Sequence, residues 1–598
     1  MTILFEKSFT PVLEQLRQRL PSILRAGQAC RLWSFDSFER RQEFTKEMQG
    51  LGYSVSALSA YKPLVAAFVE NIALENMRAV IVRYPVIEGQ HVARFRLEAY
   101  PLKELLAPVR LAFEPMEATS AEQMPVYEVE IERHGGTFEH HSIVAPNLLK
   151  KDVCGDEVFG ASGYLEVLDE ASLEVCHSEV LESDQERAYW ALMDALKAQQ
   201  WPEQEPYFPR LEMEVQAPFY DFDLLIGNEC ISTSEAMHEE LYFSALEYFQ
   251  KLGAHGAGSR RLQPGQLVPV VKHNTAQVVA RLRLRDAADV EALVAQDKGA
   301  GDVAEKSDLA DAQNWLAPAS IAQALNKLGG EAFSWHSQQG RDIEARYFEG
   351  GQPGVIISAG QHANESTGPI GALRAAAALK GKTKLGFTVS PMENPDGYAL
   401  FRAYCAENPK HMHHAARYTA GGNDLEYGSD QQERNIRVQA QTLTQALLHV
   451  NLHGYPSHEW TRPFTGYLPK GFEGWSLPKG FMLILRYKPG YADLAHHVLE
   501  QVLQELSKDD ALMTLNGEQL ARYVNYAGDP SFEFRRGIPI FISEHEGGVC
   551  PVTLVSEAPD ETVSGEEFRL LQQAQCNTTI AAVEALEDWL KLNGDRNA

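Results

Sequence analysis

The sequence predicts an α/β protein whose C-terminal domain has a mixed sheet flanked by helices, preceded by smaller α/β and β-rich N-terminal domains. Helix and strand signals alternate over residues 1–100, and period-two alternation dominates from about 106 to 180. A strand–turn–helix pattern then occupies residues 354–371. A chain of 598 residues is too long for one ordinary domain, so several units are expected.

Composition shifts suggest where these units begin and end. We expect a small α/β domain over 1–105, a β-rich domain over 106–205 and an α+β accessory segment over 206–295. Residues 296–311 are small and charged and contain glycine, which predicts a linker before a C-terminal domain over 312–598. The expected elements include helices over 9–24, 184–197 and 234–252 and strands over 91–100, 266–272 and 277–284.

Charge and cysteine content narrow the classes of function. The net charge of −28 disfavours binding to nucleic acid or to an anionic membrane surface. No cationic segment followed by an apolar run opens the chain, and no apolar run approaches membrane-spanning length. The seven cysteines are scattered and form no C-x-x-C motif, as expected in a reducing compartment. We therefore expect a cytoplasmic protein with no membrane partner.

The strand–turn–helix pattern at 354–371 brings together two metal-ligating residue types. The apolar run 355–357 predicts a buried strand, and Gly368 and Pro369 open an Ala/Leu-rich helix. His362 and Glu365 lie in the turn between them, at the edge of an α/β sheet where ligands commonly bind. An imidazole and a carboxylate three residues apart can occupy two of the four positions around zinc.

Further motifs follow the residue-312 boundary in a fixed order. Two are local motifs, S-x-x-G-R-x-I from Ser337 and N-P-D-G-Y from Asn394. Two are strand ends, V-N-L-H-G with His453 and S-F-E-F-R with Glu533. With the H-x-x-E pair, they resemble the M14 family of zinc carboxypeptidases over roughly residues 312–590.

The resemblance implies one zinc ion per chain, bound by His362, Glu365 and His453. It also implies Glu533 as the general base, with Glu544 and Glu546 as rivals. Two neutral imidazoles and one carboxylate leave an open position for a water molecule, whose proton the base removes. The expected activity is hydrolysis of C-terminal amide bonds of peptides. Expected substrate contacts are Asn364, Arg434, Asn435, Tyr523 and Tyr526.

Some positions depart from the family pattern and leave alternatives open. Asn364 stands where the family usually has an arginine, and Glu433 replaces the asparagine before Arg434. The G-x-H-A-N-E turn also resembles that of the aspartoacylase and succinylglutamate desuccinylase group, which deacylates N-acyl amino acids. The alternatives are thus an N-acyl amino acid deacylase, a muropeptide amidase, or a catalytically inactive binding protein on the same fold.

Several remaining residues have no place in this motif order. The helix carrying His238, Glu239 and Glu240 is not a zinc-protease helix, because position 242 is a tyrosine instead of the required second histidine. His458 and Glu459, just after the third expected ligand, are candidates for pocket residues. The first 300 residues resemble no family, and we expect them to restrict access to the site or to mediate assembly of a homo-oligomer.

Overall fold

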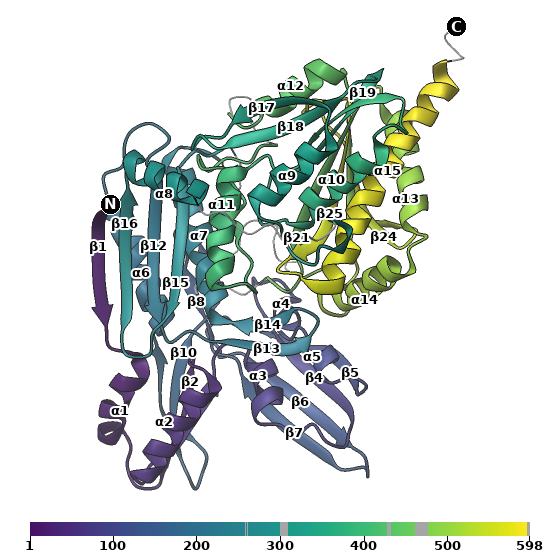
Figure 1. Ribbon diagram of the computed structural model, residues 1–598. Helices are drawn as coiled ribbons and strands as arrows, with labels where there is room; N and C mark the ends of the chain where they lie inside the picture. The colour runs from purple at the N-terminus through teal and green to yellow at the C-terminus, as the bar shows by residue number, and fades with distance from the viewer. Residues whose placement is uncertain are drawn as a thin grey trace.

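The computed structural model describes residues 1–256, 259, 261–299, 309–426, 432–460, 464 and 477–594. Residues 300–308, the centre of the expected linker, lie outside this set, as do Asp430 and Gln431 of the expected arginine motif. The order of helices and strands is shown in Figure 1. Within the described residues, no helix combines the length and the hydropathy that a bilayer span requires.

The second half of the chain is built on one mixed sheet of nine strands, which confirms the α/β prediction (Figure 1). The strands, in spatial order, are β17 (Glu331–His336), β18 (Asp342–Phe348), β20 (Leu385–Ser390), β19 (Gly351–Ala359), β21 (Leu448–Pro456), β25 (Val552–Glu561), β22 (Met482–Tyr487), β24 (Ile538–Glu544) and β23 (Glu533–Arg535). Its centre, β20-β19-β21-β25, is parallel. The carboxyl ends of these four strands therefore meet at one edge of the sheet.

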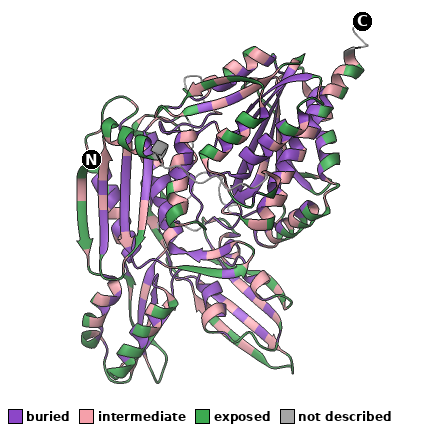
Figure 2. Ribbon diagram, viewed as in Figure 1, coloured by how far each residue is buried: buried purple, intermediate pink, exposed green. Residues whose placement is uncertain are grey.

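Helices cover both faces of this sheet. The main core packs residues of β19, β21 and β25 against a helical layer, and α12 (Asn435–Thr444) packs on the other face with a smaller cluster around Ile356 and Ala440. The helical layer consists of α9 (Pro318–Leu328), α10 (Thr367–Leu379), α13 (Ala492–Leu506), α14 (Asp510–Ala527) and α15 (Gly565–Gly594). The central strands are consequently buried along nearly their whole length (Figure 2), as expected for parallel strands covered on both faces.

The described residues of the first half form three four-stranded sheets and two short hairpins. The sheets have the orders β1-β16-β12-β15, β11-β10-β2-β3 and β5-β4-β6-β7. Their strands are β1 (Thr2–Phe9), β2 (Gln28–Ser34), β3 (Ser54–Ser59), β4 (Met77–Ile87), β5 (Arg110–Thr119), β6 (Val126–Arg133), β7 (Phe138–Val144), β10 (Gly163–Asp169), β11 (Val175–Leu181), β12 (Arg210–Ala217), β15 (Gln266–His273) and β16 (Val278–Arg285). The hairpins are β8 (Asn147–Lys151) with β9 (Glu157–Ala161), and β13 (Asp221–Ile226) with β14 (Glu229–Ser232).

These pairings cross the domain boundaries expected at 105 and 205. β1 pairs with β16 along its length, and β2 pairs with β10. The expected segments 1–105, 106–205 and 206–295 are therefore not separate sheets, because strands distant in sequence complete one another. Local composition carries no information about such long-range pairing.

The helices of the first half agree with the sequence pattern at most positions. They are α1 (Val12–Ile23), α2 (Phe38–Gly50), α3 (Pro63–Glu70), α4 (Arg94–Glu98), α5 (Leu102–Leu105), α6 (Asp184–Ala198), α7 (Thr233–Leu252) and α8 (Ala287–Gly299). The strand expected over 91–100 is wrong, because this segment contains α4. Phe95 and Leu97 of this short helix are both buried in the same core. Two buried residues at a spacing of two also fit a strand, so the sequence pattern did not distinguish the two structures here.

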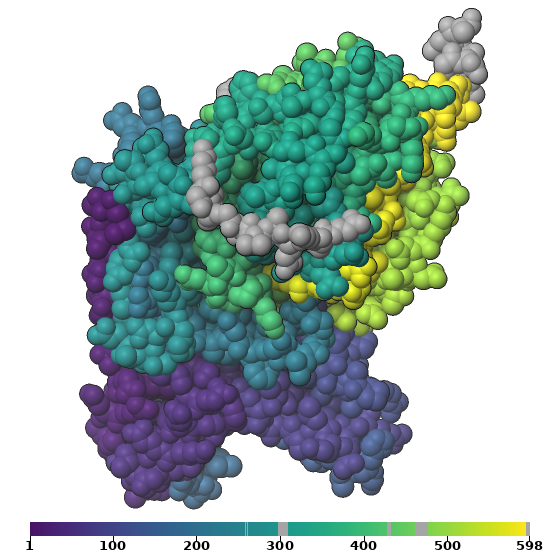
Figure 3. All heavy atoms as spheres, viewed as in Figure 1, coloured from purple at the N-terminus to yellow at the C-terminus, as the bar shows by residue number. Residues whose placement is uncertain are grey.

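The two halves pack directly against each other. In the space-filling view, residues of the first half (purple to blue-teal) lie against those of the second (teal through green to yellow) (Figure 3). Glu235, Glu239 and Glu240 of α7 accept hydrogen bonds from Met412, His414 and Phe464 of the second half. The H-E-E motif, excluded above as a zinc helix, is thus part of this contact.

One of these contacts makes stability depend on pH. Burial alone would lower the pKa of His414, but the carboxylates of Glu239 and Glu561 raise it to about 9, while Arg417 opposes them. A histidine whose pKa is raised on folding stabilises the protein fully below its unfolded value near 6.5, and this contribution is lost as pH rises through 9. The difference corresponds to about 3 kcal/mol.

We therefore expect the free energy of unfolding of wild type to fall more between pH 6.5 and 9 than that of Glu239→Gln, by part of these roughly 3 kcal/mol, because Glu561 remains in the variant. Chemical denaturation across this range measures the difference. The exposed pair of His336 with Asp342 supplies the control variant, Asp342→Asn, which should follow wild type. Parallel curves for wild type and Glu239→Gln would contradict a charged His414.

Candidate metal and hydrolytic site

The sheet and the chain reversal after β19 bring the three expected ligands together. His362 follows the carboxyl end of β19, Glu365 lies just before α10, and His453 lies in β21, the parallel neighbour of β19. All three side chains are at least nine-tenths buried. Asp560 of β25 accepts hydrogen bonds from the backbone N–H and the hydroxyl of Thr367, which fixes the start of α10 next to Glu365.

The donor atoms of these residues converge on one point. Their ligand atoms all lie within 4.8 Å of one another. His362 Nδ1 lies 2.7 Å from Glu365 Oε1, and His453 Nδ1 lies 3.3 Å from Glu365 Oε2. The two Nδ1 atoms are only 3.1 Å apart. One proton cannot satisfy all of these lone pairs, whereas a zinc ion accepts them together, so the residues fit a metal ion.

A carboxylate behind His362 orients its ring for this purpose. His362 Nε2 lies 3.3 Å from Asp424 Oδ2, and Asp424 also accepts hydrogen bonds from Gln361 and from the Glu426 backbone. Since a carboxylate only accepts, Nε2 can donate to Asp424, and Nδ1 then keeps its lone pair towards the cluster. The Gln361 amide nitrogen lies 3.2 Å from the same Nε2. Metal-binding histidines commonly have such a partner, which fixes the tautomer and raises the basicity of the ligand.

The charged neighbours keep Glu365 ionised. Burial opposes ionisation, but the neighbouring imidazoles of His362 and His453 hold the pKa of Glu365 well below its usual range. Arg417 Nη1 donates to Glu365 Oε1 at 3.1 Å, and the Gly454 N–H donates to Oε2 at 2.9 Å. Burial lowers the pKa of His453, which favours the neutral imidazole that a metal ion requires.

The structure does not bring Glu533 to this cluster, so the expected general base is corrected. Glu533 lies on β23, with its side chain 54% exposed and paired with Arg535. β23 is four strands from β21 in the sheet order, which corresponds to about 19 Å. The rivals Glu544 and Glu546 are also exposed, and Glu544 ends β24 near the same margin of the sheet.

Glu557 of β25 is the carboxylate that lies opposite His453. It pairs in register with His453 on the adjacent parallel strand, so both side chains extend from the same face of the sheet. The residue is half-buried, and among the described residues none hydrogen-bonds its carboxylate. Burial and the Glu365 carboxylate raise the pKa of Glu557 well above its usual range, while Arg417 and Arg486 act against the rise.

The residues expected to contact a substrate lie in different parts of the structure. Asn364 is buried beside the ligands, and neither its amide oxygen nor its nitrogen has a partner among the described residues. Arg434 and Asn435 lie at the start of α12, where Asn435 Nδ2 donates to the Gln432 carbonyl. The arginines that contact residues of the site are instead Arg417, bound to Glu365, and Arg437, bound to Gln361 and Glu393.

The two tyrosines, Tyr523 and Tyr526, both lie on α14. Tyr526 is fully buried against the first half, where its hydroxyl donates to Glu104 and accepts from the Lys103 N–H. This tyrosine therefore joins the two halves of the chain. The Tyr523 ring lies 5.6 Å from Lys479 Nζ, and the charge of Glu557 acts on the same ammonium group. Of the two tyrosines, Tyr523 lies nearer to the site.

The N-P-D-G-Y and S-x-x-G-R-x-I motifs hold residues next to the site in position. Asp396 of the N-P-D-G-Y turn accepts hydrogen bonds from Ser337 and Arg341, which joins it to the S-x-x-G-R-x-I segment. Asn394 caps α11 (Pro395–Glu407), and its amide also donates to the carbonyls of Arg417 and Tyr418. This turn consequently positions the segment that carries Arg417.

Sequence reasoning missed Glu557, Asp424 and Arg417. A signal for Glu557 was present, because the largely apolar run 552–555 is soon followed by this carboxylate, as the run 355–357 is followed by His362. Asp424 and Arg417 lie in an irregular segment beyond α11, where no periodicity predicts which side chain reaches the sheet edge.

Asp424 supplies a prediction for metal affinity. We expect Asp424→Asn to weaken zinc binding about 10–100-fold, because the amide nitrogen would favour the His362 tautomer with its proton on Nδ1. Titration with a competing chelator measures the change. Asp342→Asn, at the exposed Asp–His pair, is the matched control and should bind as wild type does. Equal affinities for Asp424→Asn and wild type would exclude this orienting role.

Comparisons with known proteins give matches at the level of structure only. No family model and no curated protein matches the chain. Among solved structures, it is similar to a candidate metallopeptidase from Shewanella amazonensis (15% identity, 44% of this chain and 90% of that one, TM-score 0.28). It is also similar to a metallo-carboxypeptidase from Burkholderia cenocepacia (12%, 52% and 73%, 0.29) and to a murein-tripeptide amidase from Escherichia coli O157 (13%, 42% and 92%, 0.23).

Proposed function

We propose that this chain is a zinc-dependent hydrolase of amide bonds, of carboxypeptidase type, that acts on the C-terminal bonds of peptides. The observation that carries the proposal is the convergence of His362, Glu365 and His453, beside a carboxylate, Glu557, on the neighbouring strand. Three protein ligands of this kind leave one position open, which distinguishes a catalytic zinc site from a structural one with four protein ligands.

The residues of the chain have complementary roles in this proposal. His362, Glu365 and His453 would hold a zinc ion, which would supply a Lewis acid and lower the pKa of a water molecule towards ~7. Glu557 removes the proton from this water as it attacks the scissile carbonyl, and then delivers the proton to the leaving amine. Arg417 provides a cation beside the ligands, where negative charge develops on the carbonyl oxygen.

Asn364 favours a second candidate, an N-acyl amino acid deacylase. Its amide is buried and has no partner in the described residues, so it is available to a polar group of a substrate. An amide recognises a small polar acyl group as readily as a terminal carboxylate, since it can both donate and accept. Both candidates use the same attack on an amide and differ in which side of the bond is recognised.

The decisive experiment combines metal analysis with a substrate survey. Zinc is measured by elemental analysis in wild type and His453→Ala, and both are tested on a mixed library of peptides and N-acyl amino acids. Zinc lost in the variant together with release of residues from peptide C-termini would support the carboxypeptidase. Release of small acyl groups alone would favour the deacylase. No difference in zinc content between the two proteins would overturn the assignment of the ligands.

A further inference from the structure

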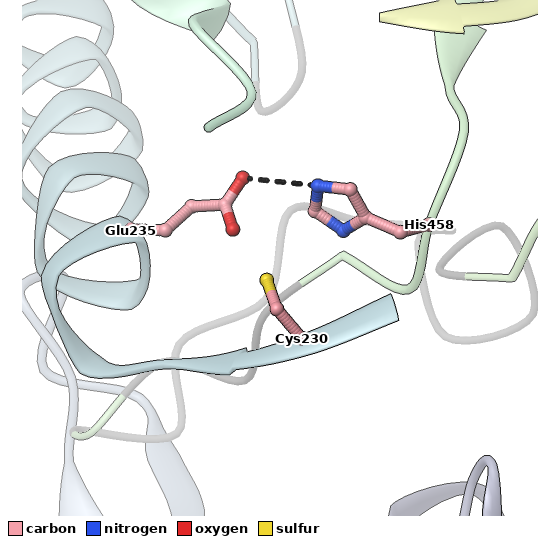
Figure 4. Close-up of side chains that lie close together, drawn as sticks. All are labelled: Cys230, Glu235 and His458. Carbon is pink, nitrogen blue, oxygen red and sulfur yellow. Dashed lines mark ion pairs between the residues drawn. The ribbon is translucent and has the colours of Figure 1, made fainter. Parts of the chain in front are cut away.

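A second group of metal-ligating side chains lies where the two halves of the chain meet (Figure 4). Cys230 is on β14, Glu235 is in the first turn of α7, and His458 follows β21, five residues beyond His453. The Cys230 Sγ, one carboxylate oxygen of Glu235 and one ring nitrogen of His458 all lie within 4.8 Å of one another. None of the three belongs to the hydrolytic site described above.

The hydrogen bonds of His458 leave one nitrogen facing this group. Its Nδ1 lies 2.9 Å from the Glu459 carbonyl oxygen, which can only accept, so Nδ1 is the donor. Nε2 lies 3.4 Å from Glu235 Oε1 without hydrogen-bond geometry, and it has no hydrogen-bond partner in the described part of the chain. A histidine ligand commonly donates from one ring nitrogen to a backbone carbonyl, which leaves the other ring nitrogen to bind the metal.

Glu235 also has an oxygen without a partner. Its Oε1 accepts from the Met412 N–H, whereas Oε2 accepts no hydrogen bond from any residue that the structure describes. The side chains of Glu235 and His458 are 0% and 1% exposed, so bulk water does not supply the missing partners. Leaving such buried polar atoms unpaired costs about 1–3 kcal/mol each, which is a physical reason to expect a ligand there.

The surrounding polar groups are already engaged and do not compete for these atoms. Glu229 accepts from the Tyr100 hydroxyl and from the Glu459 N–H. His411 Nε2 lies 3.1 Å from Asp221 and 3.4 Å from Ser232 Oγ. Burial and the carboxylates of Glu235 and Glu229 raise the pKa of the Cys230 thiol, and a divalent cation would replace its proton.

We propose that Cys230, Glu235 and His458 bind a second zinc ion, which joins β14 and α7 of the first half to the segment after β21. Thiolate, imidazole and carboxylate together suit zinc better than calcium or magnesium, which prefer oxygen ligands. Ligand atoms around a tetrahedral zinc lie about 3–4 Å apart, so small side-chain movements complete the site. A water molecule takes the fourth position. The proposal does not depend on the proposed hydrolase function.

Metal counting on the full-length chain tests the proposal. We expect about two zinc ions in wild type, about one in Cys230→Ala and about one in the His362→Ala/His453→Ala double variant. Adding Cys230→Ala to the double variant should remove the last ion. Cys154→Ala changes another half-buried cysteine and serves as the matched control, with wild-type zinc content. Circular dichroism establishes that each variant is folded before its zinc is counted.

Substitution with cobalt separates the two sites without reference to activity. Only the second site has a sulfur ligand, so the thiolate-to-cobalt charge-transfer band in the near ultraviolet reports that site alone. We expect the band in wild type, in Cys154→Ala and in the His362→Ala/His453→Ala variant, and its loss in Cys230→Ala and in the conservative variant Cys230→Ser.

Two results would overturn the second site. The band could be absent from folded wild type after cobalt loading, or Cys230→Ala could retain all of the zinc of wild type. Glu235 and His458 would then form a metal-free ion pair. Failure of the hydrolytic site has a different signature, since the His362→Ala/His453→Ala variant would then lose no zinc while Cys230→Ala still loses one ion.

Discussion

Replacement of Glu557 by glutamine is expected to lower kcat/KM about 10²–10⁴-fold while leaving the zinc content unchanged. Glutamine has nearly the same shape as glutamate, but it cannot take the proton from the attacking water or deliver it to the leaving amine. His453 lies opposite Glu557 in the β21–β25 register and keeps its own contacts with Glu365 and His362 in the variant. The loss should therefore appear mainly in kcat, because ligand geometry and substrate binding are retained.

Glu533→Gln is the matched control for this experiment. Glu533 is the residue that the family resemblance implied as the base, yet it lies exposed on β23 beside Arg535. We expect its turnover to equal that of wild type. Steady-state kinetics on the best peptide of the library, with zinc counted in the same samples, measures both variants. A large loss in Glu533→Gln with full activity in Glu557→Gln would reverse the assignment.

Removal of the first half is expected to abolish turnover and to lower the soluble yield of segment 309–598 several-fold or more. Two hydrophobic clusters of the first half are completed by side chains of the second. Met412, Trp460 and Phe464 belong to one of these clusters, and Tyr523 and Tyr526 to the other. Without the first half, these apolar surfaces would face water and promote association.

Co-expression of the two pieces distinguishes this dependence from damage at the cut. Segments 1–299 and 309–598 produced together should associate and recover soluble yield and turnover, since the buried hydrogen bonds from Glu235, Glu239 and Glu240 can re-form. Gel filtration and activity on the same fractions measure the recovery. Full solubility and activity of segment 309–598 alone would show that the first half is dispensable.

The sequence was most informative where chemistry and local structure coincide. The H-x-x-E turn follows a continuous apolar run and precedes a helix, and the structure places its two side chains as predicted from this local pattern. His453 was predicted from the resemblance of V-N-L-H-G to the strand end that carries the family's third ligand, and it lies in β21. A parallel strand buried on both faces gives a strong apolar signal, so its polar terminus stands out.

The remaining features depend on contacts between distant parts of the chain. Choosing Glu557 over Glu533 requires the strand order of the sheet, because both residues lie on strands and only one of these strands is adjacent to β21. The domain boundaries at 105 and 205 were misplaced for a similar reason, since β1 finds its partner more than 250 residues away, at β16. No local propensity encodes such pairings.

Because β25 has two roles, the kind of mutation that the protein tolerates in this strand should be restricted. This strand provides Glu557 and, three residues later, the Asp560 that holds the start of α10. A shift of one residue in a strand turns every side chain to the opposite face. We expect a single-residue deletion at Val555 to be as damaging to turnover as the loss of a ligand, although no ligand lies on β25. Deletion scanning coupled to an activity screen measures this. We expect β25 to accept some substitutions but no change of length.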